Sequence, residues 1–261
     1  MNAVSLEYHD VVAEGNADQS GFPGRAAATY KLTRPAFEQH LDAIAREARQ
    51  PPGLATEWLA STSASRPLFL TFDDGGESAY SPIADALERR GWRGHFFMTA
   101  GQIGAPTFLS SAQLRELHHR GHVIGTHSFS HPLRMGGLGR AALDEEWRRS
   151  IDIIADILAA PVLTGSVPGG FYTRAVGEAA AAAGLKVLFT SDPTTACHVV
   201  DGCRVLGRYI LREWSAAETA GALGAGRWKP RAGQWALYRS LNLARRVGGD
   251  YYTRVRNRFW P

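Results

Sequence analysis

Two pairs of side chains that could support metal or proton-transfer chemistry stand at the ends of apolar runs. Asp73 and Asp74 end the stretch "LFLTFDD", and His127 and His131 lie in "GTHSFSHP". Neighbouring carboxylates repel each other, and burying them without a partner is costly. A bound cation or a reaction gives them a reason to be there, whereas the ordinary alternative for a lone Asp-Asp-Gly is a solvated turn.

The histidine pair favours the first explanation. Two histidines and one carboxylate that leave a coordination position open for water form the ligand set of a catalytic zinc ion. Pro132 and the preceding apolar run predict a turn around His127 and His131, and a turn can bring the two imidazoles together. A lone histidine is more often a packed or surface residue, and we interpret His118, His119 and His122 in this way.

Strands and helices alternate along the chain. The apolar runs that predict strands lie at 4–12, 67–72, 94–101, 122–128, 162–167, 186–191 and 204–211. The capped or amphipathic segments that predict helices lie at 33–50, 81–91, 110–121, 139–160, 175–184 and 215–224. This alternation predicts an α/β fold with parallel strands, in an open sheet or a closed barrel. Functional groups in such folds gather at the C-terminal ends of the strands, where both pairs stand.

Composition limits the class of protein. A chain of 261 residues is long enough for one barrel-sized domain. We expect a single domain over 1–261. The net charge of +4 is modest and spread out, which argues against nucleic-acid binding. No run approaches the ~20 apolar residues of a membrane span, and no signal-peptide pattern opens the chain, so we predict a cytoplasmic protein.

The two cysteines flank a predicted hairpin turn at Asp201-Gly202. That turn places Val200 opposite Cys203 and leaves Cys197 without a cysteine across from it. A disulfide is therefore unsupported, and reduced thiols agree with a cytoplasmic location.

The motifs "TFDDG" (71–75) and "HSFSHP" (127–132) resemble the first two motifs of the polysaccharide deacetylase family, carbohydrate esterase family four. The resemblance covers roughly residues 66–212. It implies a single catalytic domain over 1–261, with a strand-loop-helix extension at 1–65, a core at 66–212 and a basic, aromatic helical end at 213–261. The segment "YHDVV" (8–12), followed by a helix with "FEQHLDAI", is similar to the N-terminal extension of exopolysaccharide-type members. The resemblance implies a NodB-like deacetylase fold, which is a distorted (β/α)7-type barrel with parallel strands.

The resemblance also implies roles for the paired residues. Asp74, His127 and His131 would bind a divalent metal, usually Zn²⁺, and Asp73 would be the general base that takes a proton from metal-bound water. The substrate would be an N-acetylated sugar of a polysaccharide or oligosaccharide, or of its precursor. Because no export signal is seen, we favour a lipid-linked or nucleotide-linked intermediate or a small glycan.

Two motifs of the family are altered in this chain. The third usually carries an arginine and an aromatic residue, but "SVPGGFYTR" (166–174) has Ser166 and Gly169 in those places. Gly169 and Gly170 either form a simple turn or present an N–H group to the oxyanion. We expect Tyr172 or Arg174 to supply the lost polar contact to Asp73. Asp192 loosely matches an aspartate that orients the family's arginine, although a simple Asp-Pro turn explains it better.

The fifth motif usually supplies a histidine as general acid, and "RVLGRYILREW" (204–214) contains none. Arg208 and Arg212 cannot serve as general acids near neutral pH. His198, on the predicted hairpin, and His9, at the end of the first strand, are the remaining candidates, each with a plain surface or packing role as the alternative.

The residues from 228 to 261 are rich in arginine and aromatic side chains, and we predict an amphipathic helix packed on the barrel. Its apolar side chains would be Trp235, Leu237, Tyr238, Leu241 and Val247. The alternative is a patch at 231–261 that binds an anionic glycan or an anionic membrane surface.

Two further functions stay open at this point. One is hydrolysis of a non-sugar amide or cyclic imide. The other is a metal-bearing glycan-binding protein, which the altered third and fifth motifs would suit.

Overall fold

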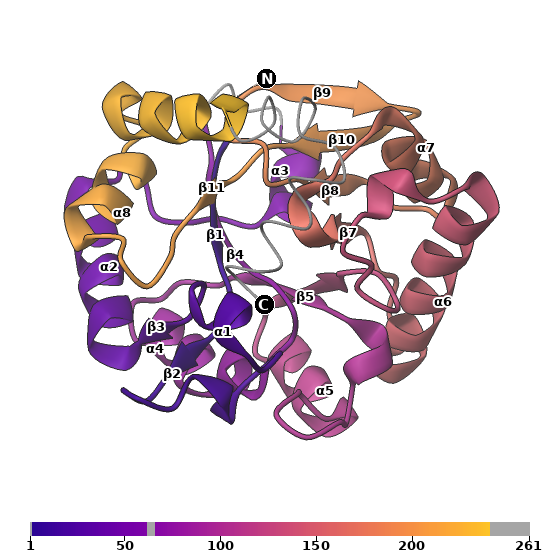
Figure 1. Ribbon diagram of the computed structural model, residues 1–261, viewed down its shortest axis with the longest axis horizontal. Helices are drawn as coiled ribbons and strands as arrows, with labels where there is room; N and C mark the ends of the chain where they lie inside the picture. Colours follow the sequence, from indigo (N-terminus) through magenta and orange to yellow (C-terminus); the bar gives the residue numbers. More distant parts are fainter. Residues whose placement is uncertain (1, 62–65, 241–261) are drawn as a thin grey trace.

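A nine-stranded sheet forms the centre of the computed structural model, which describes residues 2–61 and 66–240 (Figure 1). The strands follow the order β11-β1-β4-β5-β6-β7-β8-β10-β9. They are β1 (Val4–Tyr8), β4 (Leu68–Phe72), β5 (His95–Met98), β6 (Val123–Thr126), β7 (Thr164–Ser166), β8 (Val187–Phe189), β9 (Cys197–Val200), β10 (Cys203–Leu206) and β11 (Tyr209–Ile210). A separate parallel pair joins β2 (Val11–Val12) to β3 (Leu32–Thr33).

The sheet curls into a distorted (β/α)7-type barrel, as predicted. All neighbouring strands are parallel except β9, which forms a hairpin with β10. β10 pairs with β8, and β11, which follows after only two residues, pairs with β1 at the opposite edge. One continuous segment therefore joins both edges, and β10–β11 together with β1, β4, β5, β6, β7 and β8 fill the seven positions.

Our prediction of an unbroken strand at 204–211 was wrong at Gly207. A Cβ atom on Gly207 would lie 2.1 Å from the carbonyl oxygen of Asp192, so only glycine allows this close approach. The break separates β10 from β11 and places Arg208 between them. The predicted N-terminal extension also contributes to the barrel itself, because β1 lies between β4 and β11.

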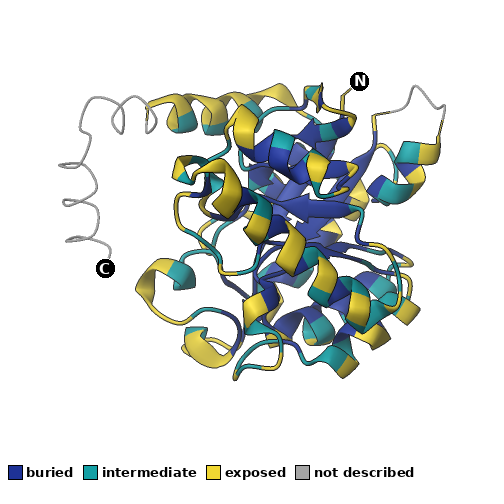
Figure 2. Ribbon diagram, turned by 90° about the vertical axis from the view of Figure 1, so that its right-hand side faces the viewer, coloured by how far each residue is buried: buried dark blue, intermediate teal, exposed yellow. Residues whose placement is uncertain are grey.

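Helices cover the outside of the sheet, with their exposed faces turned to solvent (Figure 2). The labelled helices are α1 (Arg25–Ala28), α2 (Arg34–Glu47), α3 (Ala55–Ala60), α4 (Asp85–Glu88), α5 (Ser111–His119), α6 (Arg140–Leu158), α7 (Arg174–Ala182) and α8 (Ala217–Gly224). Thr33 caps α2, and Ser110 and Gln113 form a reciprocal capping box on α5. Residues 228–240 form a last helix, drawn in yellow at the top of Figure 1. No helix of the described chain has the length and apolar character needed to cross a bilayer.

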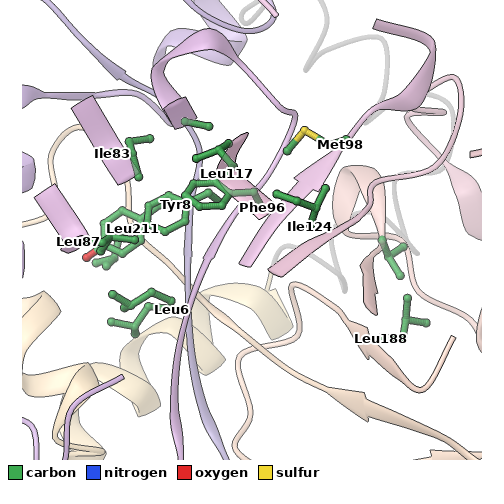
Figure 3. Packing of buried hydrophobic residues seen from close by; sticks show 14 of the residues in the cluster. Leu6, Tyr8, Ile83, Leu87, Phe96, Met98, Leu117, Ile124, Leu188 and Leu211 are labelled. Carbon is green, nitrogen blue, oxygen red and sulfur yellow. The ribbon is translucent and has the colours of Figure 1, made fainter. Parts of the chain in front are cut away.

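Alternation along the strands divides the core in two. On β4, Leu68, Leu70 and Phe72 face the helices, where they join a large apolar cluster with residues such as Leu6 and Tyr8 (Figure 3). Phe69 points the other way, into the barrel, with a smaller cluster. The members of that inner cluster are Ala3, Ala55, Trp58, Phe69, Phe97, Val187, Phe189 and Leu206. Successive strand residues point to opposite faces, so both sides of the sheet are packed.

Candidate active site

The alternation of side chains along β4 explains where Asp73 and Asp74 point. Phe69 and Thr71 point into the barrel, and Asp73 is the next residue on that face. Asp74 would then point outward, but its φ of 74° turns the chain, a conformation that aspartate tolerates better than most residues. Both carboxylates therefore remain at one site, and both are buried, at 4% and 8% exposed.

Asp74, His127 and His131 form a ligand set. Asp74 Oδ1 lies 3.6 Å from His127 Nε2 and 3.4 Å from His131 Nε2, and ligand atoms of the three residues lie within 4.8 Å of one another. Three tetrahedral ligands at 2.0–2.2 Å from zinc would be roughly 3.4 Å apart. Asp74 Oδ1 is buried and has no hydrogen-bond partner among the described residues. An unpaired buried carboxylate oxygen facing two imidazole nitrogens fits a divalent cation.

His127 is held in the orientation that a metal ligand needs. Its Nδ1 lies 2.6 Å from Ser166 Oγ and 3.1 Å from the Ser166 carbonyl oxygen, which leaves Nε2 directed at Asp74. Burial lowers the pKa of His127 to about 4, so the ring is neutral at pH 7, as metal ligation requires. Ser166 thus has a function of its own in the place where the family has arginine.

His131 is presented by a tight turn. Ser128 and His131 both adopt positive φ, at 65° and 56°, and Ser128 Oγ accepts a hydrogen bond from the His131 N–H at 3.1 Å. Glu146 of α6 fixes the turn by accepting hydrogen bonds from the N–H groups of Phe129 and Ser130, both at 2.9 Å. This turn, rather than a helix, brings the imidazole of His131 back to Asp74, as the sequence predicts.

Asp73 is paired with Arg208, a contact that the sequence analysis missed. Arg208 Nη1 and Nη2 each donate to one carboxylate oxygen of Asp73, both at 2.7 Å. Arg208 is fully buried, and its Nε lies 3.2 Å from Glu7 Oε2 of β1. Burial opposes ionisation of Asp73, but the charge and the hydrogen bonds of Arg208 outweigh it and hold the pKa of Asp73 below its usual value.

Our expectation that Tyr172 or Arg174 contacts Asp73 was wrong. The Tyr172 hydroxyl lies 3.2 Å from His198 Nε2, and Arg174 begins α7, where it pairs with Glu178 one turn later. Arg208 takes their place because the break at Gly207 directs it into the barrel. A signal was present, since an arginine inside the apolar run "RVLGRYIL" must either break the strand or find a buried carboxylate.

The two candidate acids lie in different environments. His198 is on the exposed edge strand β9, bonded to Tyr172. His9 follows β1, and ligand atoms of His9, Glu7 and Asp73 lie within 4.8 Å of one another. The Nδ1 atom of His9 is buried and has no hydrogen-bond partner in the described part of the chain. Only His9 of the two is therefore within reach of the reacting groups.

The remaining candidates lie in two loops at the rim. Gly169 and Gly170 have φ of 66° and 68°, and a Cβ atom on Gly169 would lie 2.4 Å from the carbonyl oxygen of Leu133. Gly169 thus permits close packing against the loop after His131, and an oxyanion role for either glycine stays a prediction. The carbonyl of Asp192, not its carboxylate, accepts a hydrogen bond from the backbone N–H of Arg208 at 3.0 Å.

The two cysteines are free. Cys203 pairs with Val200 across the hairpin, and Cys197 lies opposite Leu206. The register predicted from Asp201-Gly202 is thereby confirmed, as is the lack of a cysteine opposite Cys197.

The geometry agrees with a comparison of the sequence against known families. The model of the polysaccharide deacetylase family matches residues 60–188. Residues 60–188 belong to the polysaccharide deacetylase family. Members of this family are hydrolases that act on the amide bonds of N-acetylated sugars. The matched region includes Asp73, Asp74, His127 and His131, whereas Glu7, His9 and Arg208 lie outside it.

Individual relatives match shorter stretches. The chain is 29% identical to a chitin deacetylase of Arthroderma benhamiae over 41% of this chain and 26% of the relative. It is 36% identical to the peptidoglycan-N-acetylmuramic acid deacetylase PdaA of Bacillus subtilis over 25% of this chain and 24% of the relative. This chain spans about a quarter to about a half of the length of the curated relatives it matches.

A solved structure extends the likeness to the whole fold. The Streptococcus pyogenes deacetylase PplD, determined in complex with acetate, superposes with a TM-score of 0.69 over 84% of this chain and 96% of PplD, at 18% identity. At that identity the likeness concerns the fold, and it confirms the NodB-like barrel.

Proposed function

We propose that this protein is a divalent-metal-dependent hydrolase that removes acetyl groups from N-acetylated sugars of a glycan or a glycan precursor. The observation that carries the proposal is the adjacency of two differently held carboxylates. Asp74 Oδ1 faces two imidazoles without a hydrogen bond, while Asp73 is kept ionised by Arg208. Asp74 is therefore suited to bind a metal ion, and Asp73 is suited to act as a base.

Asp74, His127 and His131 are the residues that would hold the ion, and we expect Zn²⁺ because of the histidine-rich ligand set. When bound, the ion supplies Lewis-acid activation of the carbonyl and makes water acidic enough to attack near neutral pH. Ser166 keeps the imidazole of His127 in the ligating orientation throughout, since it binds the opposite ring nitrogen.

The protein groups move the protons. Asp73 accepts a proton from the attacking water as the new C–O bond forms, and Arg208 keeps the carboxylate in position for it. His9 donates a proton to the sugar nitrogen as the C–N bond breaks, which releases acetate and the amine. His9 is suited to this step because it lies beside Asp73 and its Nδ1 has no hydrogen-bond partner among the described residues.

The structure gives less reason to favour the two alternative functions. A glycan-binding protein without turnover, and a hydrolase of a non-sugar amide or cyclic imide, were suggested by the altered third and fifth motifs. Arg208 and His9 offer the two missing groups from other strands, which favours an intact deacetylase. A cytoplasmic location, a lipid-linked or nucleotide-linked substrate and membrane-surface contact through 231–261 stay predictions, and residues 241–261 lie outside the described part of the chain.

Replacement of the base tests the proposal. Asp73→Asn removes the proton acceptor but leaves Asp74, His127 and His131 in place. We expect acetate release from N-acetylated oligosaccharides to fall by about 10² to 10⁴, with zinc content by mass spectrometry unchanged. Asp144→Asn, which alters a partly exposed aspartate paired with Arg140 on α6, is the matched control. An unchanged rate in Asp73→Asn would exclude Asp73 as the base.

A further inference from the structure

A row of side chains in contact with one another leads away from His9 toward solvent. The rings of His9 and Tyr30 lie 4.7 Å apart, and the guanidinium carbon of Arg212 lies 4.6 Å from the Tyr30 ring. The same guanidinium also lies 5.4 Å from the ring of Trp214, which is 64% exposed. The inner end of this row is the proposed acid, and the outer end is an exposed aromatic face.

The side chain of Arg212 donates no hydrogen bond to any residue in the described ranges 2–61 and 66–240. In the described residues, no carboxylate lies within ion-pair distance of its guanidinium and no side-chain hydrogen bond satisfies it; its side chain contacts the two rings, and its backbone N–H donates to Ser215 Oγ. The buried and half-buried arginines nearby differ, since Arg208 binds Asp73 and Arg231 binds the Tyr209 hydroxyl and Thr195. Aromatic contacts orient a guanidinium while leaving its N–H edge for a planar anion.

The loop that carries Arg212 is anchored on several sides. The Arg212 N–H donates to Ser215 Oγ at 2.9 Å, and the Glu213 N–H donates to the Thr29 carbonyl at 3.1 Å. His40 of α2 lies 2.8 Å from the carbonyl oxygen of Ser215. Backbone anchoring at 29, 212, 213 and 215 holds the two aromatic rings at a fixed spacing, so the site for an anion is preorganised.

We propose that Tyr30, Arg212 and Trp214 form a subsite for an acidic group on the substrate, and this rests on the proposed deacetylase function. The acidic group is a carboxylate or phosphate carried by the glycan next to the sugar that is deacetylated. Arg212 binds its oxygens through charge-assisted hydrogen bonds, and the exposed face of Trp214 receives the adjoining sugar ring. The protein therefore acts on acidic glycans or sugar phosphates in preference to neutral chains.

The test compares three soluble substrates on the zinc-loaded full chain. N-acetylchitotetraose is neutral, a hyaluronan tetrasaccharide carries carboxylates, and UDP-N-acetylglucosamine carries phosphates. We expect kcat/KM for acetate release to favour at least one acidic substrate over the neutral one, and whichever is favoured identifies the source of the charge. Added salt should shrink that preference.

Variants then assign the preference to the subsite. We expect Arg212→Gln to reduce the ratio of acidic to neutral kcat/KM about tenfold, mainly through KM, and Arg212→Lys to restore part of it. Arg239→Gln is the matched control, since Arg239 is an exposed arginine stacked on Trp235 in the helix 228–240. Thermal melting of each variant is the check that it is folded.

The possible outcomes distinguish failure of the subsite proposal from failure of the proposed deacetylase function. No acidic preference in the wild type, or an Arg212→Gln ratio equal to that of the wild type, overturns the subsite. If no substrate releases acetate, the deacetylase proposal fails, and calorimetric binding of the same three compounds to wild type and Arg212→Gln decides on the subsite alone. About tenfold weaker binding of an acidic compound to the variant supports it, and equal binding overturns it.

Discussion

The interior of the barrel has two layers of opposite character. At the C-terminal ends of the strands it holds charged residues, with Arg208 bridging Asp73 and Glu7. One layer below, aromatic rings fill the same space, and the ring of Phe189 lies 5.4 Å from that of Phe97 and 6.0 Å from that of Phe69. The layers meet where the Arg208 guanidinium lies 6.0 Å from the Phe97 ring. Both layers come from inward-facing residues of the same sheet.

A buried histidine in each layer shows what separates a packed residue from a ligand. Burial lowers the pKa of both His95 and His127 to about 4. His95 Nε2 accepts a hydrogen bond from the Ala55 N–H at 2.9 Å, and its Nδ1 lies 3.0 Å from the Leu70 carbonyl oxygen. His127 uses only Nδ1, on Ser166, and its Nε2 faces Asp74. Both histidines are therefore buried, and they differ in the second ring nitrogen, which is hydrogen-bonded in His95 and directed at Asp74 in His127.

The largest effect is expected from neutralising the upper layer. Arg208→Met leaves Asp73 and Glu7 buried without their counter-charge, so the free energy of unfolding should fall by about 3 to 5 kcal/mol, as measured by urea denaturation. Acetate release should fall about 100-fold, because Asp73 loses the group that orients it. Arg120→Met, at a partly exposed ion pair with Glu88, is the control. Wild-type stability in Arg208→Met would mean that the charged layer is not held by this arginine.

The lower layer should respond to pH instead. The folded protein holds His95 neutral down to about pH 4, whereas the unfolded chain protonates it near pH 6.5. The unfolded state binds more protons between these values, so stability is complete above about pH 6.5 and falls as the pH drops toward 4. Glutamine in His95→Gln keeps an acceptor for Ala55 but does not titrate. Between about pH 7 and about pH 4.5, the free energy of unfolding should therefore fall by about 2 to 3 kcal/mol more in the wild type than in His95→Gln. Parallel pH profiles of urea denaturation for the two proteins would contradict this assignment.

A smaller effect should come from the outside of the barrel, where the helix 228–240 supports the Arg208 segment. Gln234 accepts a hydrogen bond from the Ile210 N–H at 3.1 Å and donates to the Ile210 carbonyl at 2.9 Å, as a neighbouring strand would. Gln234→Ala should lower the free energy of unfolding by about 1 to 2 kcal/mol. Lys229→Ala, at an exposed position of the same helix, should change it by less than about 0.5 kcal/mol. An equal change in the free energy of unfolding for the two variants would show that the hydrogen bonds of Gln234 to Ile210 do not stabilise β11.

The same helix corrects one part of the sequence analysis. It packs on the barrel, as predicted, but it does so through the polar side chains of Arg231 and Gln234 and the hydroxyl of Tyr238. Trp235 and Leu237, predicted to face the barrel, are 51% and 59% exposed. Leu241 and Val247 lie outside the described residues. Helical spacing located the segment, but it could not tell which side the barrel would occupy.

Local sequence was sufficient for residues that share a strand end or a turn. "LFLTFDDGG" placed two carboxylates after a buried strand, and "GTHSFSHP" placed two histidines in one turn, so the ligand set was predicted from two short segments. The order of the strands and helices followed from periodicity. The break at Gly207 was the main error, because it depends on a carbonyl of Asp192 that approaches from a different segment of the chain.

What the amino-acid order determined by itself was therefore the α/β fold and the placing of two carboxylates and two histidines at strand ends, since both depend on periodicity or spacing within short segments. The separate roles of Asp73 and Asp74 came from the resemblance of their motif to that of the deacetylase family. What only the tertiary structure decided was which groups accompany these residues: Arg208 beside Asp73, His9 rather than His198 as the proposed acid, and Arg212 on the Tyr30 ring that contacts His9. These contacts join segments that are far apart in the sequence, and they form only when β11 closes the barrel against β1.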